Sequence, residues 1–388
     1  MERLIPALEA LFNDHRADDG ALFDGLCQSL IGLGLPLWRD VMQFPMLHPL
    51  YLGHTLYWWR DQGVSIMPRP HGFEESAEFL ESPYKASLDR DGPLRVHLMD
   101  LDDPGLPLLR ELKAKGGTDF INALIPAHGM ITPGVSWTSD APGGFTENDI
   151  ALLTSLTSFL GPPFALRAER RTVRIMLETY LGAGPGKEVL GGAVQHGDTR
   201  KIEAVILQTD LRGFNAKSLA WPPSDLLAEL DAYFEAVVDA VHYRGGDVLK
   251  FIGDGVLAVF PVDVEVTAPT AARNAMVAIQ RAFADLDESN RKLRARWGGE
   301  PLTMAASLDI GSVVYGNIGG RSCLDFTVIG PAVNRGSRIL DHAKNVGRPV
   351  VVSAAINDLL GDGLQPLGTH QLDGLNEATA LFANQDKS

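Results

Sequence analysis

The sequence is poor in cysteine and contains no long apolar run. Among its 388 residues are two cysteines, Cys27 and Cys323, too far apart for a disulfide framework or a zinc-site motif. No stretch of about 18 uninterrupted apolar residues occurs, and acidic residues follow closely on the first methionine. We therefore expect a cytoplasmic protein in a reducing compartment, without a membrane span.

Basic residues are also in deficit. The chain carries 34 lysines and arginines against 49 acidic residues, a formal net charge of −15. Such a chain repels polyanions, which argues against a nucleic-acid partner, and a phosphorylated ligand would need local cations or metal ions. With 45% hydrophobic and 21% charged residues, the composition is that of a globular protein, and the length suggests two or three domains.

The first half of the chain shows helical patterns at its two ends. The first ~20 residues predict an amphipathic helix. Thr146 and Asp149 have the spacing of a capping box and precede apolar residues at helical intervals. Gly161-Pro162-Pro163 is expected to interrupt that helix, and a second helix would run from Phe164 to Leu181.

The second helix and the segment after it predict a link between domains. Leu166, Val173 and Tyr180 recur every seven residues, which fits either a parallel coiled coil between two chains or a helix packed on its own domain. The run that follows, LGAGPGKEVLGGAVQHGDTRK, is rich in glycine and predicts a flexible joint.

From Ile202 the pattern alternates between strands and helices. We expect a strand, a helix, a hairpin around GDG, a long helix, two strands around a glycine, another helix, and a last strand and helix. This alternation predicts a sheet covered by helices.

Two aspartates have positions suited to a metal ion. Asp210 ends a predicted strand and precedes the turn LRGF, and Asp254 lies in the glycine turn. Carboxylate oxygens bind hard cations, and glycine neighbours let a metal and a phosphate approach the backbone. Taken alone, each aspartate is better explained as an ordinary turn residue.

Asn334 and Arg338 lie four residues apart in a predicted helix and so share one face. An asparagine can orient an oxygen atom, and an arginine can offer its planar fork to a phosphorus centre that gains negative charge. In isolation, this pair is better explained by a helix cap and a surface arginine.

Together, these positions fall in blocks that strongly resemble the class III nucleotidyl cyclases. The blocks occur in the family's order, between Ile202 and about Ile356: VILQTDLRGFNAKS, LDAYFEAVVDAVHYRGGDVLKFIGDGVLAVF and LDIGSVVYGNIGGRSCLDFTVIGPAVNRGSRI. The resemblance implies an α/β (α+β) catalytic domain over residues 201–388, with a ferredoxin-like core sheet covered by helices.

The resemblance also implies the catalytic roles. Asp210 and Asp254 match the family's two metal-binding aspartates, which would hold two Mg²⁺ ions per site, with Mn²⁺ as an alternative. Asn334 and Arg338 match the catalytic pair that acts on the transition state.

Four further positions match residues that contact the nucleotide. Lys250 matches the lysine that reads the adenine ring, and Thr327 falls where many members have aspartate and a subgroup has threonine. This pair resembles adenylate rather than guanylate cyclases, in which it is typically glutamate and cysteine. Phe214 is assigned to substrate binding, and Arg321 lies near a triphosphate-binding arginine of some members.

The function implied is that of an adenylate cyclase, a phosphorus–oxygen lyase that converts ATP to 3′,5′-cyclic AMP and pyrophosphate. Active sites in this family form between two catalytic domains, so the resemblance implies a homodimer. Two departures concern Pro331, where the family usually has a polar residue, and Asp373, where many members have a basic residue that holds the terminal phosphates. Either Asp373 weakens ATP binding or the positive charge comes from elsewhere.

The order of the predicted elements over residues 1–165 resembles a GAF sensor domain, which implies regulation by a small molecule or a protein. Residues 166–200 would then be a linker helix and a glycine-rich joint. Several aromatic side chains fit either a ligand pocket or an ordinary core: Trp38, His48, Trp58 and Trp59.

Three other functions remain as alternatives. A guanylate cyclase is the nearest, and a non-catalytic nucleotide-binding signalling module is the second. The string RGGDVLKF suggests a diguanylate cyclase, but it lacks the acidic residue that this family's signature requires after GGD, so this alternative is the least favoured.

Overall fold

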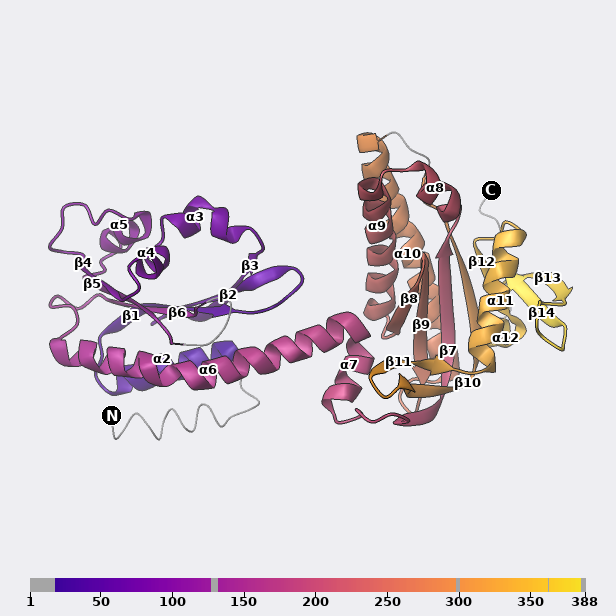
Figure 1. Cartoon of the computed structure of the whole chain (residues 1–388), viewed down its shortest axis with the longest axis horizontal. Coiled ribbons are helices and arrows are strands. Elements are labelled where there is room, and N and C mark those ends of the chain that lie inside the picture. Colours follow the sequence, from indigo (N-terminus) through magenta and orange to yellow (C-terminus); the bar gives the residue numbers. More distant parts are fainter. Residues whose placement is uncertain (1–17, 127–131, 298–300, 362, 385–388) are drawn as a thin grey trace. The chain divides into compact units, whose positions relative to one another are not determined.

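The computed structural model describes residues 18–126, 132–297, 301–361 and 363–384. The chain divides into two compact units, Met1–Met176 and Leu177–Ser388. The helix predicted at the N-terminus lies almost wholly outside the described residues. Each unit combines a largely antiparallel sheet with packed helices, which confirms the mixed α/β class (Figure 1).

The N-terminal unit is built on one antiparallel sheet with the strand order β3-β2-β1-β6-β5-β4. The central strands are buried along almost their whole length, as expected for a sheet covered on both faces. The strands are β1 (Leu37–Pro45), β2 (Tyr51–Trp59), β3 (Gly63–Pro70), β4 (Leu94–His97), β5 (Asp119–Leu124) and β6 (Gly134–Ser139).

Two helices cover one face of this sheet, α2 (Asp19–Gly32) and α6 (Glu147–Leu181), and their apolar residues share a hydrophobic core with the strands (Figure 1). Shorter helices lie over the opposite face: η1 (Phe73–Glu75), α3 (Ala77–Leu80), α4 (Pro83–Asp89) and α5 (Pro107–Ala114). The assignment of this unit to the GAF domains stays a prediction.

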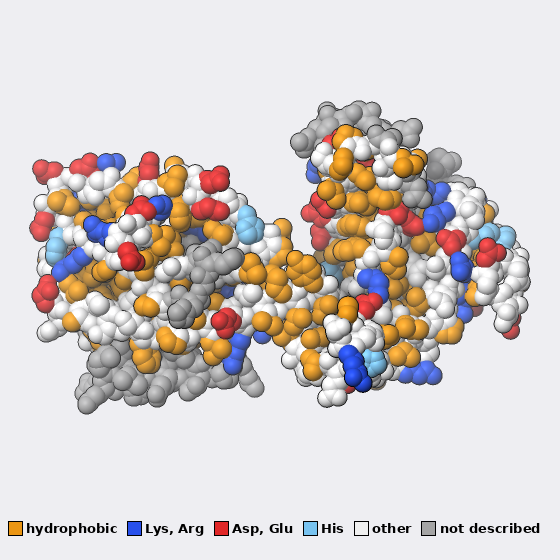
Figure 2. Space-filling model, in the orientation of Figure 1, with side chains coloured by type: hydrophobic (Ala, Val, Ile, Leu, Met, Phe, Trp, Pro, Cys, Tyr) orange, Lys and Arg blue, Asp and Glu red, His pale blue; other side chains and the backbone are white. Residues whose placement is uncertain are grey.

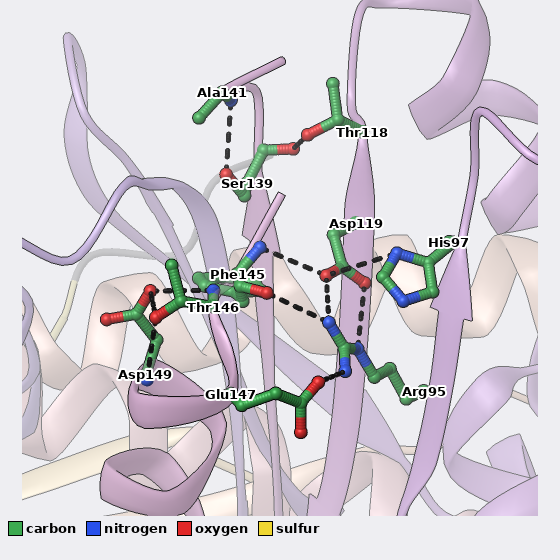
Figure 3. Close-up of polar contacts among 10 residues, drawn as sticks. All are labelled: Arg95, His97, Thr118, Asp119, Ser139, Ala141, Phe145, Thr146, Glu147 and Asp149. Carbon is green, nitrogen blue, oxygen red and sulfur yellow. Dashed lines mark hydrogen bonds and ion pairs between the residues drawn. The ribbon is translucent and has the colours of Figure 1, made fainter. Parts of the chain in front are cut away.

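The start of α6 is held by a polar network (Figure 3). The predicted capping box is confirmed, because the Thr146 amide donates to the Asp149 carboxylate at 2.8 Å and the Asp149 amide donates to the Thr146 hydroxyl at 3.2 Å. Arg95 on β4 forms ion pairs with the buried Asp119 and with Glu147, each at 3.0 Å. The arginine therefore ties α6 to the edge of the sheet.

The break predicted in this helix is wrong, because α6 continues through Pro162 and Pro163. Each proline removes one N–H donor, yet Leu160 and Phe164 on either side are buried in the core and hold the helix in place. Gly161 serves a different purpose: a Cβ atom there would lie 2.1 Å from the carbonyl oxygen of Pro126. The glycine admits a neighbouring backbone and does not end the helix.

Within the described residues, α6 is the one helix that is long and apolar enough to cross a membrane by length and composition, and 33% of its apolar window is buried in the protein. The absence of a membrane span stays a prediction. The heptad positions Leu166, Val173 and Tyr180 are exposed, with 49%, 52% and 79% of their surface accessible. The coiled coil between two chains stays a prediction.

The sheet of the C-terminal unit has the order β13-β14-β12-β10-β7-β9-β8, with β11 paired to β10. Its core elements follow the chain as β7-α9-β8-β9-α10-β10 and lie in the order β10-β7-β9-β8, which confirms the predicted ferredoxin-like sheet. The strands are β7 (Thr199–Leu211), β8 (Asp247–Ile252), β9 (Gly255–Val262), β10 (Met304–Gly320), β11 (Cys323–Ile329), β12 (Val350–Ser353), β13 (Gln365–His370) and β14 (Thr379–Ala383).

Helices cover both faces of this sheet (Figure 1). The larger core packs α9 (Pro223–Tyr243), α10 (Ala268–Trp297) and α12 (Ala354–Leu360) against one face. On the other face lie α11 (Pro331–Asn345) and α7 (Ala183–Leu190), with smaller cores beneath them. The remaining helix, α8 (Phe214–Ala220), follows β7.

The break predicted between two strands at a glycine of this unit is wrong, and part of the expected glycine-rich joint is helical. The two strands expected around Gly311 are one long strand, β10; a Cβ atom there would lie 3.0 Å from that of Ala332, so the glycine gives α11 room to pack. The expected glycine-rich joint contains α7. Gly184 donates its amide to Asp247 at 3.0 Å, and a Cβ atom there would lie 2.3 Å from that carboxylate. Both glycines allow close packing rather than a break or flexibility.

Candidate active site

Alternation along β7 decides where Asp210 points. Leu207 and Leu211 face the core beneath α9 and α10. Gln208 and Asp210 face the opposite side, where the Gln208 amide donates to the Val333 carbonyl of α11 at 3.0 Å. The Asp210 carboxylate therefore lies between the end of β7 and α11.

Strand pairing brings Asp254 to the same place. Asp210 is opposite Gly255 in the antiparallel ladder between β7 and β9, and Asp254 is the residue before this glycine in the β8–β9 turn. Burial, with the neighbouring Asp210 carboxylate, raises the pKa of Asp254 to about 6. The two carboxylates thus interact directly, as two ligands of shared cations would.

A lysine that the sequence analysis missed, Lys344, lies beside this pair of carboxylates. The Lys344 ammonium lies 2.5 Å from the Asp210 carboxylate, and the partly buried carboxylate raises the pKa of Lys344 although burial opposes this. The lysine supplies one positive charge where two negative charges meet.

The donor set suits magnesium bound together with a nucleotide. No group of three or more His, Cys, Asp or Glu side chains that could hold a metal occurs among the described residues. Magnesium commonly takes one or two carboxylates and completes its octahedron with phosphate oxygens and water. Asp210 and Asp254 would therefore hold the metal only weakly until a polyphosphate adds its own oxygens.

Asn334 and Arg338 lie on the solvent side of α11, because the opposite side of the helix packs on the sheet through Ala332, Ile339 and Leu340. The Arg338 guanidinium lies 3.5 Å from Asp341, which in turn lies 3.8 Å from Lys344. A line of alternating charges thus runs along α11 towards Asp210. No ion pair joins Arg338 to Asp210 or Asp254 in the described part of the chain.

Lys250 and Thr327 lie on neighbouring segments of the sheet. The Lys250 ammonium forms an ion pair with Asp325 of β11, a second residue that the sequence analysis missed. Asp325 and Thr327 are two residues apart on this strand, so their side chains point to the same face. The ion pair thus joins Lys250 to the strand that carries Thr327.

The other predicted positions lie on separate elements of the C-terminal unit. Phe214 begins α8 and packs against the hydrophobic core. Arg321 is exposed in the turn between β10 and β11, and Asp373 is exposed ahead of β14. Pro331 occupies the first turn of α11, where its missing N–H costs no helical hydrogen bond.

For each of the two missed residues, Lys344 and Asp325, the sequence contains a pattern that indicates its position. Arg338, Asp341 and Lys344 repeat every three residues along one helix, a spacing that brings charges together. Asp325 is two residues before Thr327, so strand periodicity alone puts it on the same face. Neither pattern predicts the partner of the missed residue. Lys344 pairs with Asp210 and Asp325 pairs with Lys250, and both partners are far away in the chain.

No family model matches the chain. Its sequence is 26% identical over 269 residues to adenylate cyclase 1 of Rhizobium meliloti, an alignment that covers 67% of this chain and 39% of that protein. It is 28% identical over 158 residues to the adenylate cyclase of Anabaena cylindrica, covering 41% of this chain and 30% of the relative. The chain spans about a third of the length of these curated relatives.

Two solved cyclase structures align with about half of the chain. The adenylyl cyclase CyaB of P. aeruginosa is 23% identical with a TM-score of 0.42, covering 49% of this chain and 97% of that one. The guanylyl cyclase Cya2 is 26% identical with a TM-score of 0.42, covering 50% and 96%.

The sequence relatives confirm the resemblance to the nucleotidyl cyclases. Both of the curated relatives described above carry the name adenylate cyclase.

Proposed function

We propose that the C-terminal unit is an adenylate cyclase that converts ATP to 3′,5′-cyclic AMP and pyrophosphate. The observation that carries this proposal is the meeting of Asp210 and Asp254 at the end of β7, beside the cation of Lys344. The names of the curated relatives support the same reaction.

In the proposed reaction, the ribose 3′-oxygen forms a bond to the α-phosphorus, the bond from that phosphorus to the bridging oxygen breaks, and pyrophosphate leaves. The 3′-hydroxyl proton is lost to solvent. Divalent metal held by Asp210 and Asp254 would lower the pKa of this hydroxyl and neutralise the triphosphate. Arg338 would offer its planar fork to the charge that gathers on the α-phosphoryl group, and Asn334 would orient the ribose.

The acidic chain needs local positive charge for a triphosphate, and Lys344 is the candidate. Asp373 occupies the position where a basic residue was expected to help. Lys344 already lies at the carboxylate pair. With Asp210 engaged as a metal ligand, the Lys344 ammonium would pair with a phosphate oxygen of the triphosphate.

For the base, the ion pair of Lys250 with Asp325 supports adenine. Asp325 would hold the ammonium so that it donates to a ring nitrogen, and the Thr327 hydroxyl would accept from the exocyclic amine. Guanine presents a protonated nitrogen at the corresponding edge, which the ammonium would repel.

We further propose that the active sites form between two copies of the chain. Asn334 and Arg338 are exposed in one chain, and hydrophobic side chains are frequent around α9 on the visible face of the C-terminal unit (Figure 2). Exposed apolar residues on neighbouring elements support a contact surface there: Leu219 of α8, Leu227 of α9, and Phe251 and Ile252 of β8. The exposed heptad positions of α6 support the same pairing.

A mixing experiment tests both the reaction and the shared site. Asp210→Asn and Arg338→Ala should each abolish most cyclic AMP formation from ATP. When equal amounts are mixed and allowed to exchange, half of the dimers contain both variants, and each has one intact site of two, so about a quarter of the wild-type activity should return.

The outcomes separate the claims. Activity with GTP exceeding that with ATP would favour the guanylate cyclase alternative. Failure to recover activity, with exchange proven by differently tagged copies, would contradict a site shared between chains. A protein that binds ATP but forms no cyclic product under any metal would be the non-catalytic module.

A further inference from the structure

A large cavity lies in the N-terminal unit, on the face of the sheet opposite α2 and α6. Its volume is about 740 Å³, within the range of small-molecule sites. Aromatic side chains from strands and helices line much of it: Tyr57, Trp59, Phe73, Phe79, Tyr84 and Phe120. Of the aromatic residues considered in the sequence, Trp59 lines this cavity, whereas Trp58 is fully buried in the core.

A buried cation forms part of the cavity wall. Arg39 of β1 is 5% exposed, and its Nη1 atom has no hydrogen-bond partner. Its guanidinium carbon lies 5.4 Å from the ring centroids of both Tyr57 and Trp59. No ion pair joins Arg39 to a carboxylate in the described part of the unit. An unpaired buried charge is costly, so a ligand that supplies the counter-charge would gain from pairing with Arg39.

The same unit contains a second buried charged residue, whose partners all come from its own chain. Asp119 is fully buried, but Arg95 pairs with it at 3.0 Å and the Phe145 amide donates to it at 3.1 Å (Figure 3). Arg39 has no such partner. The difference indicates that the counter-charge of Arg39 comes from outside the chain.

Nearby acidic groups do not fill this role. Glu111 pairs with Lys115 at 2.7 Å, and Glu78 pairs with Arg69 at 3.0 Å. Burial raises the pKa of Asp40 to about 8, so its carboxyl group is largely protonated at neutral pH. Glu81 also lines the cavity, but it is exposed to solvent and forms no ion pair with Arg39 in the described part of the chain. Of the two arginines that line the cavity, Arg69 pairs with Glu78, whereas Arg39 pairs with no carboxylate among the described residues.

We propose that this cavity binds a small organic monocarboxylate with an apolar, aromatic body, whose carboxylate pairs with Arg39. The guanidinium fork matches a carboxylate, and the surrounding rings offer stacking surfaces for the body. Glu78, Glu81 and Glu111 also line the cavity and would repel a second negative charge, which disfavours phosphates and diacids. This inference rests on the N-terminal unit alone and does not depend on the proposed cyclase reaction.

The test measures binding to the purified full chain by isothermal titration calorimetry. The probes are benzoate, phenylacetate and indole-3-acetate, each compared with its uncharged primary amide, and inorganic phosphate. At least one acid should bind saturably, one molecule per chain and at least tenfold more tightly than its amide. Arg39→Gln should remove this preference for the acid.

Two further variants control the result. Arg110→Gln removes an exposed arginine of the same unit, paired with Asp103 outside the cavity, and should leave binding unchanged. Ser136→Leu places a larger side chain on the buried cavity wall and should weaken acid and amide alike.

Four outcomes would overturn the proposal. In the first, none of the three acids binds the wild-type chain. In the second, acid and amide bind equally. In the third, Arg39→Gln keeps the preference for the acid. In the fourth, phosphate binds more tightly than every acid. The wild-type comparisons need no variant, so the proposal stays testable if Arg39→Gln does not fold.

Discussion

The two units cover a sheet with helices on both faces, yet they differ in where they leave groups without a partner. In the N-terminal unit the unpaired Arg39 lies inside a cavity whose walls all come from one chain. In the C-terminal unit, Asp210 and Asp254 meet at a strand end, while Asn334 and Arg338 face solvent. The first arrangement can bind a ligand as a single chain. The second, with the shared active site proposed above, requires another copy of the chain.

The comparison therefore predicts different responses to the same treatment. Dilution should abolish the cyclase activity as the copies separate, and it should leave the affinity of the N-terminal cavity unchanged. Substitutions in either unit sharpen this contrast.

The largest effect is expected for Asp254→Asn. Loss of one of two carboxylates should lower cyclic AMP formation by roughly 100-fold or more, because the metal loses half of its protein ligands. The affinity of the N-terminal cavity for its carboxylate should stay within twofold. Turnover and calorimetry on the same preparation check both statements.

The matched control is Asp263→Asn, which changes an exposed aspartate that accepts hydrogen bonds from the Glu265 and Val266 amides in its own turn. Its turnover should stay within twofold of the wild type. Near-full activity in Asp254→Asn would contradict the metal assignment.

A smaller effect is expected from Asp40→Asn, which should change how the free energy of unfolding depends on pH. The pKa of Asp40 in the folded chain is about 8, raised by burial, against about 4 in an unfolded chain. The folded state therefore keeps a proton that the unfolded state loses, and this group's contribution to stability falls as pH rises towards 8. Between pH 6 and pH 8 the loss should be roughly 2 kcal/mol, and asparagine, which mimics the protonated acid, should abolish it.

Denaturant unfolding at both pH values measures this difference. Tryptophan fluorescence is a suitable signal for the N-terminal unit, because most tryptophans belong to it: Trp38, Trp58, Trp59 and Trp137. The difference between wild type and variant isolates Asp40 from other titrating groups. An equal pH dependence in both proteins would mean that Asp40 is ionised throughout.

The smallest effect concerns Lys344→Met. Without its ammonium, the Asp210 and Asp254 carboxylates repel each other in metal-free buffer, and the free energy of unfolding should fall by about 1 kcal/mol. Added Mg²⁺ should restore stability more in the variant than in the wild type. Thermal unfolding with EDTA and with Mg²⁺ measures both.

Lys292→Met is the control, since Lys292 is an exposed lysine of α10 that lies near Glu288. Its stability should change little and should not respond to Mg²⁺ differently from the wild type. An equal response of Lys344→Met and the control would show that Lys344 does not balance the acidic pair.

Local patterns in the sequence predicted much of the fold. The capping box at Thr146 and the hairpin around Asp254 follow from short-range spacing, and the ferredoxin-like core follows from the family resemblance; the structure agrees with all three. The errors concern glycine and proline. Gly161 and Gly311 look like breaks in the sequence but admit a neighbouring backbone or helix, a property of elements distant in the chain.

The candidate site also has a part that local patterns predict and a part that depends on distant elements. The positions of Asp210 and Asp254 follow from motifs, because each lies at the end of a local element. Lys344 and Asp325 could not be matched to Asp210 and Lys250, because such pairs depend on which strand lies beside which helix. Periodicity predicts which face of a helix or strand a side chain lies on, but not which residues of other elements lie opposite that face.

The sequence alone predicted the class of reaction and its candidate residues, because the family resemblance that implies them is carried by contiguous motifs. Only the tertiary structure decided which charges meet, and that the aromatic residues around Arg39 enclose a cavity instead of filling it. Contacts of this kind arise when segments far apart in the chain pack together. No local pattern encodes the volume left between them.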